Sequence, residues 1–297
     1  MRHRPAPPPG HPWNYTLWVA GWESGPAPPT MKRGLGLSDI RHNTGGKFER
    51  CEIELPTGPL SYFVGGDGPP FLHIHGAGGL RVSNALQELT GSHRVYMPLA
   101  PGFDDTPAHD DLNSFPELAD MLAHFAQTEI GAPCPVNGHA MGGRLVIWYA
   151  ILHGDKAGKV ICQCPSGLRT ADRTITDAQY TARVVTHADR VPDENRSSEV
   201  VAANRTAGHR YHTPGKGIVQ AQFRDQDMID RLGEITCEML ILQGALDGVL
   251  APDSVEFLAS QVKSARLVLV EDAGHLIEID QRASFLELVR GFLAQDV

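Results

Sequence analysis

The sequence predicts an α/β protein in which a mostly parallel sheet, of the eight-stranded type, is flanked by helices and carries an inserted helical cap. From about residue 50 onward, short β-rich runs alternate with helical stretches, as in a parallel sheet with crossover helices. Hydrophobic residues make up 41% of the 297 residues and charged residues 21%, which suits a globular protein with a large core. Between about residues 165 and 234 the strand pattern stops, and it resumes afterwards.

Eight segments have the composition of strands. The first two, residues 50–55 and 60–64, are close enough in sequence to form an antiparallel pair, and residues 71–74 have the apolar character of an inner strand. The rest of the sheet is assigned to residues 94–97, 135–137, 158–162, 239–242 and 266–270.

Helices are expected between these strands. Ser114 and Glu117 have the S-x-x-E spacing of a capping box, which satisfies N–H groups at the start of a helix. The helix that they open carries apolar residues on one face, namely Leu118, Met121, Leu122 and Phe125. Residues 145–152 and 285–292 are predicted to form further packing helices.

The chain divides into three predicted parts. Residues 1–46 hold eight of the 22 prolines before Thr30, and proline lacks the N–H that regular structure needs, so we expect a disordered segment. Residues 47–164 and 235–297 form the predicted core. Residues 165–234 are too long for a plain connection and are predicted to fold as a cap, or lid, over that core.

Charge and cysteine usage exclude several classes of function. The formal net charge of -9 gives no basic footprint for nucleic acid or an anionic membrane surface, and no run of about 18 apolar residues occurs. The expected partner is therefore a small-molecule substrate; the oligomeric state is not predicted. The five cysteines lack the paired spacing of a disulfide framework, and the apolar stretch at residues 15–20 is too short for a signal peptide, so a cytoplasmic location is expected.

A glycine-flanked turn lies at residues 137–143, Asn-Gly-His-Ala-Met-Gly-Gly. It follows a predicted strand and opens a predicted helix, and its glycines permit a sharp turn that pushes the central residue out at the C-terminal edge of the sheet. This pattern is typical of the G-x-S-x-G nucleophile elbow. Ala140, however, occupies the position of the serine.

Three further segments are expected at the same edge of the sheet. Residues 75–79 form a glycine-rich loop after the third strand, whose backbone N–H groups can face a developing oxyanion. Asp247 and His275 each follow a later strand, so the carboxylate can orient the imidazole and stabilise its protonated form. In the order elbow, aspartate, histidine, these residues predict a catalytic triad with Ala140 at the nucleophile position.

From about residue 50 to residue 297 the chain resembles the α/β-hydrolase superfamily, both in the segments above and in Pro101-Gly102-Phe103, which is similar to the family's P-G-F turn. The resemblance implies an oxyanion hole formed by the backbone N–H groups of Ala77 and Met141. It also implies that the site needs no metal and no organic cofactor. Four residues near this centre are predicted to bind substrate: Gly76, Gly78, His139 and Cys164.

Ala140 limits what the resemblance implies. A methyl group cannot attack a carbonyl, so a covalent acyl-enzyme at this position is excluded, as are reactions that need a carboxylate nucleophile there. Two explanations remain: a serine replaced to trap a substrate, or a native alanine beside which His275 activates water as a general base. The second case resembles the aminoacrylate hydrolase of pyrimidine breakdown, which has a G-H-A-L-G elbow.

The predicted function is hydrolysis of an ester, lactone, amide or C–C bond in a small organic substrate. The alternative is a non-catalytic small-molecule binding protein or receptor that keeps the same pocket. The presence of both Asp247 and His275 favours the enzyme, since a binding protein needs neither. His73 and His75 share one face of a strand, but no carboxylate or cysteine lies at a spacing that would complete a metal site.

Overall fold

The computed structural model describes residues 44–168, 184–191, 196–212, 224–250 and 252–295. The predicted disordered segment, residues 1–46, lies outside the described residues except for its last three. Parts of the predicted cap, residues 165–234, also lie outside them. Within the described residues, no helix combines the length and the apolar composition that a membrane span requires.

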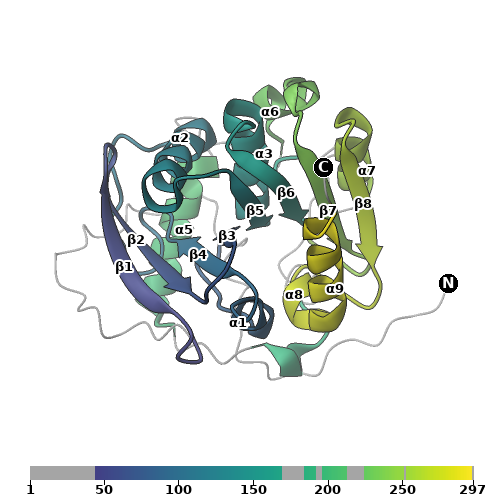
Figure 1. Ribbon diagram of the computed structural model, residues 1–297, viewed down its shortest axis with the longest axis horizontal. Helices are drawn as coiled ribbons and strands as arrows, with labels where there is room; N and C mark the ends of the chain where they lie inside the picture. The colour runs from purple at the N-terminus through teal and green to yellow at the C-terminus, as the bar shows by residue number, and fades with distance from the viewer. Residues whose placement is uncertain (1–43, 169–183, 192–195, 213–223, 251, 296–297) are drawn as a thin grey trace.

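One eight-stranded sheet organises the protein, in the order β1-β2-β4-β3-β5-β6-β7-β8 (Figure 1). β2 is antiparallel to β1 and β4, and the other neighbouring pairs are parallel. The strands are β1 (Glu49–Leu55), β2 (Gly58–Gly65), β3 (Pro70–Ile74), β4 (Arg94–Pro98), β5 (Cys134–His139), β6 (Ala157–Gln163), β7 (Glu238–Gly244) and β8 (Ala265–Val270). The predicted mostly parallel sheet is confirmed, and each predicted strand overlaps an observed one.

β5 is longer than its composition predicts, and its extra residues matter for the site. The apolar pattern ends at residue 137, but Gly138 and His139 continue the ladder opposite Cys162 and Gln163 of β6. Pairing with the neighbouring strand therefore outweighs the low strand propensity of these residues. As a result, the strand runs directly into the turn that carries Ala140.

Helices cover both faces of the sheet (Figure 1). The first layer, α2 (Phe115–Phe125), α3 (Met141–His153) and α7 (Pro252–Gln261), shares one hydrophobic core, which also takes in side chains from α5 (Ser198–His212) and α6 (Gln226–Asp230). The second layer packs in a separate core and consists of α1 (Asn84–Leu89), α8 (Ile277–Asp280) and α9 (Arg282–Leu293). The described residues also form the short helices η2 (Ala126–Ile130), η3 (Ala188–Arg190) and η5 (Leu232–Glu234).

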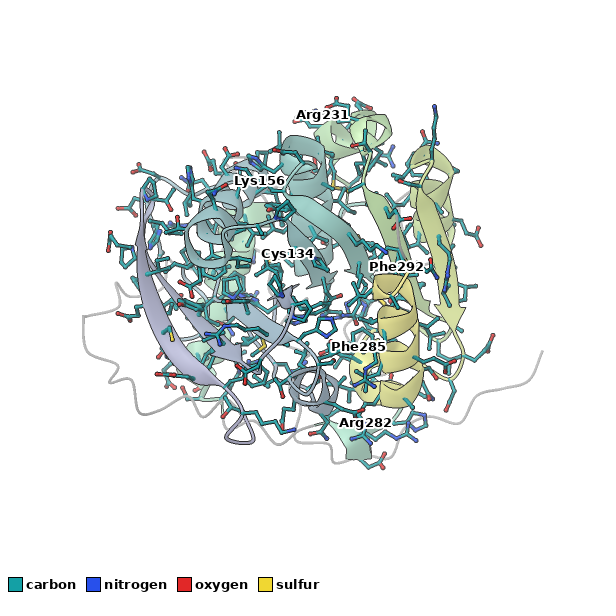
Figure 2. All side chains as sticks on the ribbon, in the orientation of Figure 1. Cys134, Lys156, Arg231, Arg282, Phe285 and Phe292 are labelled. Atoms are coloured by element: carbon teal, nitrogen blue, oxygen red, sulfur yellow. The ribbon has the colours of Figure 1, made fainter. Side chains whose placement is uncertain are left out.

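α9 shows how the second layer is anchored. Phe285 and Phe292, both labelled in Figure 2, lie seven residues apart on this helix and are almost completely buried. The ammonium group of Lys159, on β6, donates a 2.9 Å hydrogen bond to the carbonyl of Phe292 and lies 5.2 Å from the centre of its ring. The predicted helix at residues 285–292 is therefore present, and a buried cation fixes its C-terminal end.

The predicted capping box opens α2, with one difference in its partners. The Ser114 hydroxyl accepts from the N–H of Glu117 at 3.4 Å, as expected. The Glu117 carboxylate accepts from the N–H of Asn113 at 2.6 Å, one residue before the capping serine. The box thus provides acceptors for a backbone N–H before the helix as well as for one in its first turn.

α3, the helix that follows the predicted elbow, is tied to the segment that returns from the cap region. Asp225 forms a buried ion pair with Arg144, with a Nη2–Oδ2 distance of 2.6 Å, and accepts from the indole N–H of Trp148 at 2.8 Å. Its other oxygen caps α6 by accepting from the N–H of Met228 at 3.1 Å. One carboxylate therefore joins two helices.

We expect Asp225→Ala to destabilise the protein by about 3–5 kcal/mol, because it leaves the Arg144 guanidinium buried without its counter-ion. Urea unfolding measures the loss. Asp227→Ala, which removes an exposed carboxylate two residues away on α6, is the matched control and should cost less than about 1 kcal/mol. Equal losses in the two variants would contradict this role of the ion pair.

Candidate functional site

Ala140 lies at a strained turn between β5 and α3. Its backbone has φ 52° and ψ -103°, a conformation that costs a residue with a Cβ about 1–3 kcal/mol. Its N–H donates to the carbonyl of Gln163 at 2.9 Å, and its own carbonyl accepts from the N–H groups of Ser166 at 3.0 Å and Arg144 at 3.1 Å. Backbone bonds to β6 and α3 therefore hold the turn in place.

Close backbone contacts explain the glycines on either side of Ala140. A Cβ at Gly138 would lie 2.2 Å from the carbonyl oxygen of Gly142, and a Cβ at Gly142 would lie 2.3 Å from that of Ile74, at the end of β3. Neither position has space for a side chain. The sequence pattern at residues 137–143 is thus the pattern that this sharp turn requires.

Asp247 and His275 meet as predicted. Nδ1 of His275 lies 2.9 Å from Oδ2 of Asp247, whose side chain has no exposed surface. The Asp247 carboxylate also accepts from the N–H groups of Val249 at 2.7 Å and Leu250 at 3.1 Å, and from the amide of Gln243 at 2.9 Å. Four hydrogen bonds therefore fix the carboxylate, which in turn orients the imidazole.

The pKa of Asp247 lies below its ordinary value. Burial by itself raises the pKa of this carboxyl, but the attraction of His275 and the hydrogen bonds from His275, Leu250 and Val249 lower it by more. The group is consequently an anion at neutral pH. That is the state in which it can stabilise a protonated imidazole.

His275 lies beside the turn that carries Ala140. The ring of His139, the residue before Ala140, has its centre 4.8 Å from that of His275, and its Nε2 lies 3.0 Å from the carbonyl of His275. Burial, and then the nearby His275, hold the pKa of His139 well below its ordinary value, so its neutral ring donates to that carbonyl. Among the described residues, no hydrogen bond uses Nε2 of His275.

The predicted oxyanion loop is a tight turn next to the elbow. The N–H of Gly79 donates to the carbonyl of Gly76 at 3.1 Å, which closes a turn around Ala77. Nδ1 of His75 lies 2.8 Å from the same carbonyl, while Nε2 of His75 accepts from the N–H of Ala100 at 3.0 Å. Both ring nitrogens of His75 therefore contact loop backbone.

The backbone N–H groups of Ala77 and Met141 remain available for a ligand. Met141 begins α3, where N–H groups have no acceptor within the helix. Within the part of the chain that the structure describes, neither N–H donates a hydrogen bond. The two residues come from loops that meet where Gly142 approaches the carbonyl oxygens of Ile74 and His75.

The four predicted substrate-binding residues have different surroundings. Gly76 is half-buried against His139, which is itself half-buried, and Gly78 is exposed. Cys164 has no exposed surface, and its Sγ lies within 4.8 Å of a carboxylate oxygen of Asp247 and a ring nitrogen of His275. Burial raises the pKa of the Cys164 thiol well above its ordinary value, so it is a neutral group packed against the pair.

A cation would fit this cluster poorly. Cys164, Asp247 and His275 form the group of metal-ligating side chains found among the described residues. The oxygens of Asp247 already accept four hydrogen bonds, and the thiol would have to lose a proton in a buried place. His73 is likewise engaged with the amide of Asn137 at 2.7 Å, and burial lowers its pKa to about 3.

Sequence reasoning missed Asp280, which fixes the loop that carries His275. This fully buried carboxylate accepts from the N–H of Gly274 at 2.7 Å and from those of Thr186 and His187, at 3.0 and 2.8 Å, in the described part of the predicted cap. Val184 contributes too, because its carbonyl accepts from the N–H of His275 at 2.9 Å. An acidic residue within the apolar run Leu-Ile-Glu-Ile-Asp is the pattern that could have revealed it.

Backbone strain concentrates at this edge of the sheet. Four residues other than glycine have positive φ in the described chain: Asp104, Ala140, Cys164 and Asp272. Each follows the C-terminal end of a strand, respectively β4, β5, β6 and β8. Such strain persists where surrounding contacts over-determine the backbone, which is common at functional sites.

Comparisons with known proteins show the family and the fold of the chain. A model of the alpha/beta hydrolase family matches residues 71–288. The pimeloyl-(acyl-carrier protein) methyl ester esterase of Aeromonas hydrophila subsp. hydrophila is 22% identical over 253 residues, which are 77% of this chain and 96% of that relative.

Solved structures share the fold. A membrane phospholipase A described as a bacterial virulence factor gives a TM-score of 0.66 at 18% identity, over 83% of this chain and 86% of that one. A meta-cleavage product hydrolase from Pseudomonas fluorescens IP01 was solved as a serine-to-alanine mutant with acetates. It gives a TM-score of 0.62 at 21% identity, over 82% of this chain and 97% of that one. At such identities these structures support the fold alone.

Strain at the elbow can be measured. Ala140→Gly should raise the free energy of unfolding by about 1 kcal/mol, because relief of strain exceeds the added entropy of the unfolded chain. Ala150→Gly, a buried position inside α3, should instead lower it by at least about 1 kcal/mol. Thermal unfolding of both variants compares them, and an equal loss would mean that Ala140 is unstrained.

The lowered pKa of Asp247 makes its contribution to stability depend on pH. A carboxyl with a lowered folded-state pKa stabilises the fold above the unfolded-state pKa, about 3.9, and loses that contribution as the pH falls through the folded-state value. The difference in unfolding free energy between the wild type and Asp247→Asn should therefore be largest near pH 7 and shrink below about pH 4. Urea unfolding at several pH values measures it.

The exposed Asp111 supplies the control for this experiment. Asp111→Asn makes the same chemical change and should shift stability by less than about 0.5 kcal/mol at every pH. A difference for Asp247→Asn that stays constant from pH 7 to pH 3 would show that its carboxylate charge contributes nothing.

Proposed function

Because the chain belongs to the alpha/beta hydrolase family, we propose that it is a hydrolase of an ester, lactone, amide or C–C bond in a small organic substrate, with Ala140 at the position of the nucleophile and water as the attacking group. The observation that carries this proposal is the 2.9 Å bond between His275 and Asp247 beside the strained turn at Ala140. A base and its orienting carboxylate are retained where only the attacking oxygen is missing. Ester substrates come first, since a relative that matches over 77% of the chain is an esterase.

In this mechanism His275 acts as the general base. Its Nε2 takes a proton from water while the water oxygen forms a bond to the substrate carbonyl carbon, and Asp247 stabilises the resulting imidazolium. The oxygen of the carbonyl becomes an anion that accepts hydrogen bonds from the N–H groups of Ala77 and Met141. The intermediate then collapses, the bond to the leaving alkoxide breaks, and His275 returns the proton to it, giving acid and alcohol.

The described parts of the proposed cap support a role in binding. Residues 184–191 bond to the His275 loop through Asp280, and residues 196–212 bond to the glycine loop. We assign the cap to residues 165–234 and expect it to exclude water other than the reacting molecule. The five cysteines are free thiols, which supports the proposed cytoplasmic location. The proposed partner is a small-molecule substrate.

Ala140→Ser tests whether the catalytic groups are assembled. The added hydroxyl would be next to the imidazole and the two N–H groups, so hydrolysis of an activated aryl ester should rise by at least about 100-fold, with a burst from an accumulating acyl-enzyme. A fluorophosphonate probe should also label residue 140. Stopped-flow absorbance and intact-protein mass spectrometry measure these two results.

Ala140→Ser/His275→Ala is the control, and it should lose both the burst and most of the labelling, because serine without its base is a poor nucleophile near neutral pH. The slow reaction of the unmodified protein should likewise depend on His275. A folded Ala140→Ser protein that neither reacts with the probe nor hydrolyses esters would refute the proposal. The non-catalytic binding protein would then be the better interpretation.

A further inference from the structure

We infer that Asp104, Asn204 and Arg196 are positioning residues that fasten the cap to the oxyanion loop and so hold the N–H of Ala77 in place. We call these three residues the cap clamp. Its catalytic consequence rests on the proposed function, whereas its effect on the order of the loop does not. The two parts can therefore be tested separately.

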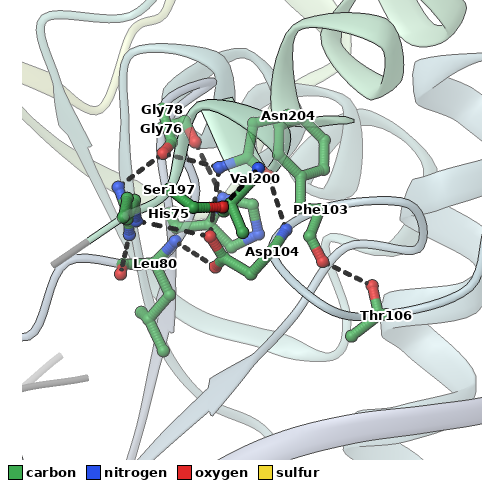
Figure 3. Close-up of polar contacts among 11 residues, drawn as sticks. His75, Gly76, Gly78, Leu80, Phe103, Asp104, Thr106, Ser197, Val200 and Asn204 are labelled. Carbon is green, nitrogen blue, oxygen red and sulfur yellow. Dashed lines mark hydrogen bonds and ion pairs between the residues drawn. The ribbon is translucent and has the colours of Figure 1, made fainter. Parts of the chain in front are cut away.

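Asp104 is the centre of the clamp. It follows β4 with φ 53°, a strained backbone for an aspartate, and its side chain has no exposed surface. One oxygen accepts from the N–H of Leu80 at 2.9 Å, as Figure 3 shows. A buried anion in a strained conformation persists only where its partners compensate.

Asn204, on α5, supplies two of these partners. Its amide nitrogen donates to Oδ1 of Asp104 at 3.0 Å, and its amide oxygen accepts from the N–H of Asp104 at 2.5 Å (Figure 3). The same nitrogen donates to the carbonyl of Gly78 at 2.9 Å. Asn204 is 1% exposed, so water does not compete for these bonds.

Arg196 adds the compensating charge. Its Nε lies 3.5 Å from Oδ1 of Asp104, and its two terminal nitrogens donate to the carbonyls of Gly78 at 2.6 Å and Leu80 at 2.5 Å. A planar guanidinium can make these contacts at once, which the single ammonium of a lysine cannot. The side chain is 10% exposed.

The glycines of the loop depend on these external bonds because they have no side chain to pack, whereas Leu80 is buried in the core. A Cβ at Gly79 would lie 2.3 Å from Asp104 and 2.5 Å from Asn204. Three backbone groups, the two carbonyls and the N–H described above, bond to the clamp instead of to the sheet. Since Gly79 closes the turn around Ala77, a displacement of residues 78–80 would move the proposed oxyanion donor.

The cap is therefore more than a cover in this inference. Asn204 bonds to Asp104, 100 residues away in sequence, and each of the two also bonds to the loop, so departure of α5 would remove the clamp and loosen the oxyanion hole together. Catalytic competence would follow cap docking even with the Asp247–His275 bond intact. Such coupling would keep the oxyanion site unformed until the cap is seated.

Isosteric exchange tests the structural part. Asp104→Asn places an amide nitrogen opposite a donor, either the amide of Asn204 or the N–H of Leu80, and Asn204→Asp sets two carboxylates against each other. In each variant, hydrogen exchange of the Leu80 and Gly79 amides should be at least about 10-fold faster than in the wild type, with β5 amides as the internal reference. The double exchange again offers one donor and one acceptor across the pair, so it should recover at least half of the lost protection at Leu80.

The catalytic part is measured in the Ala140→Ser background with the same aryl ester. Adding Asp104→Asn should lower kcat by about 10- to 100-fold with little change in KM, because an oxyanion donor acts in the transition state. Arg196→Lys keeps the charge without the planar contacts, so its kcat should lie between that of Ala140→Ser alone and that of the variant with Asp104→Asn. Asp111→Asn, the same change at an exposed position of the same connection, should leave kcat and hydrogen exchange unchanged.

The outcomes separate the two proposals. Faster exchange at Leu80 together with an Ala140→Ser protein that is inactive would support the clamp and refute the proposed hydrolase. Unchanged exchange at Leu80 in both single variants would overturn the clamp, whatever the activity. Equal acceleration of the loop and of β5 would also overturn it, since general destabilisation would then explain the effect. A loss of kcat/KM that comes only from a higher KM, with kcat unchanged, would overturn the assignment to oxyanion positioning.

Discussion

The site depends on one close contact between backbones, where the turn after β5 is pressed against the end of β3. Gly142 lies so near the carbonyl of Ile74 that a Cβ would be 2.3 Å from it, and Gly138 is equally crowded by Gly142. This contact brings α3 against the glycine loop and places the N–H groups of Met141 and Ala77 on neighbouring loops. The parallel pairing of β3, β5 and β6 maintains it, since each strand ends at the same edge of the sheet.

Two buried carboxylates connect the remaining loops to the cap in similar ways. Asp280 receives N–H groups from the His275 loop and from residues 186–187, and Asp104 receives the N–H of Leu80 and the amide of Asn204. In both cases a buried carboxylate bonds the proposed cap and a loop of the candidate site at the same time. Because a buried charge left without partners costs several kcal/mol, each connection favours one position of its loop over others. The cap and the site are thereby expected to order together.

The sequence was sufficient for features that depend on local pattern. All eight strands, the elbow at residues 137–143 and the meeting of Asp247 with His275 could be predicted, because alternation, glycine spacing and position after a strand are visible in a single chain. Asp104 and Asn204 could not, since their roles arise from partners distant in sequence, and Asp280 was marked only by its acidic side chain next to apolar residues. The strand pattern also ended too early at β5, where pairing with β6 extends the strand through Gly138 and His139. Contacts between distant parts of the chain thus explain both the residues that were not predicted and the wrong C-terminal end of β5.

The alanine at position 140 separates the geometry of the elbow from its chemistry. Nothing that holds the turn uses a side-chain oxygen: its bonds run from backbone to backbone, through Gln163, Ser166 and Arg144. The orientation of His275 is equally independent, because four hydrogen bonds fix Asp247 without any contribution from residue 140. A site assembled in this way keeps His275, Asp247 and the N–H groups in position whichever small side chain stands at the turn. In the proposed mechanism, exchange of alanine for serine would therefore change which oxygen attacks while leaving His275 and the two N–H groups in place.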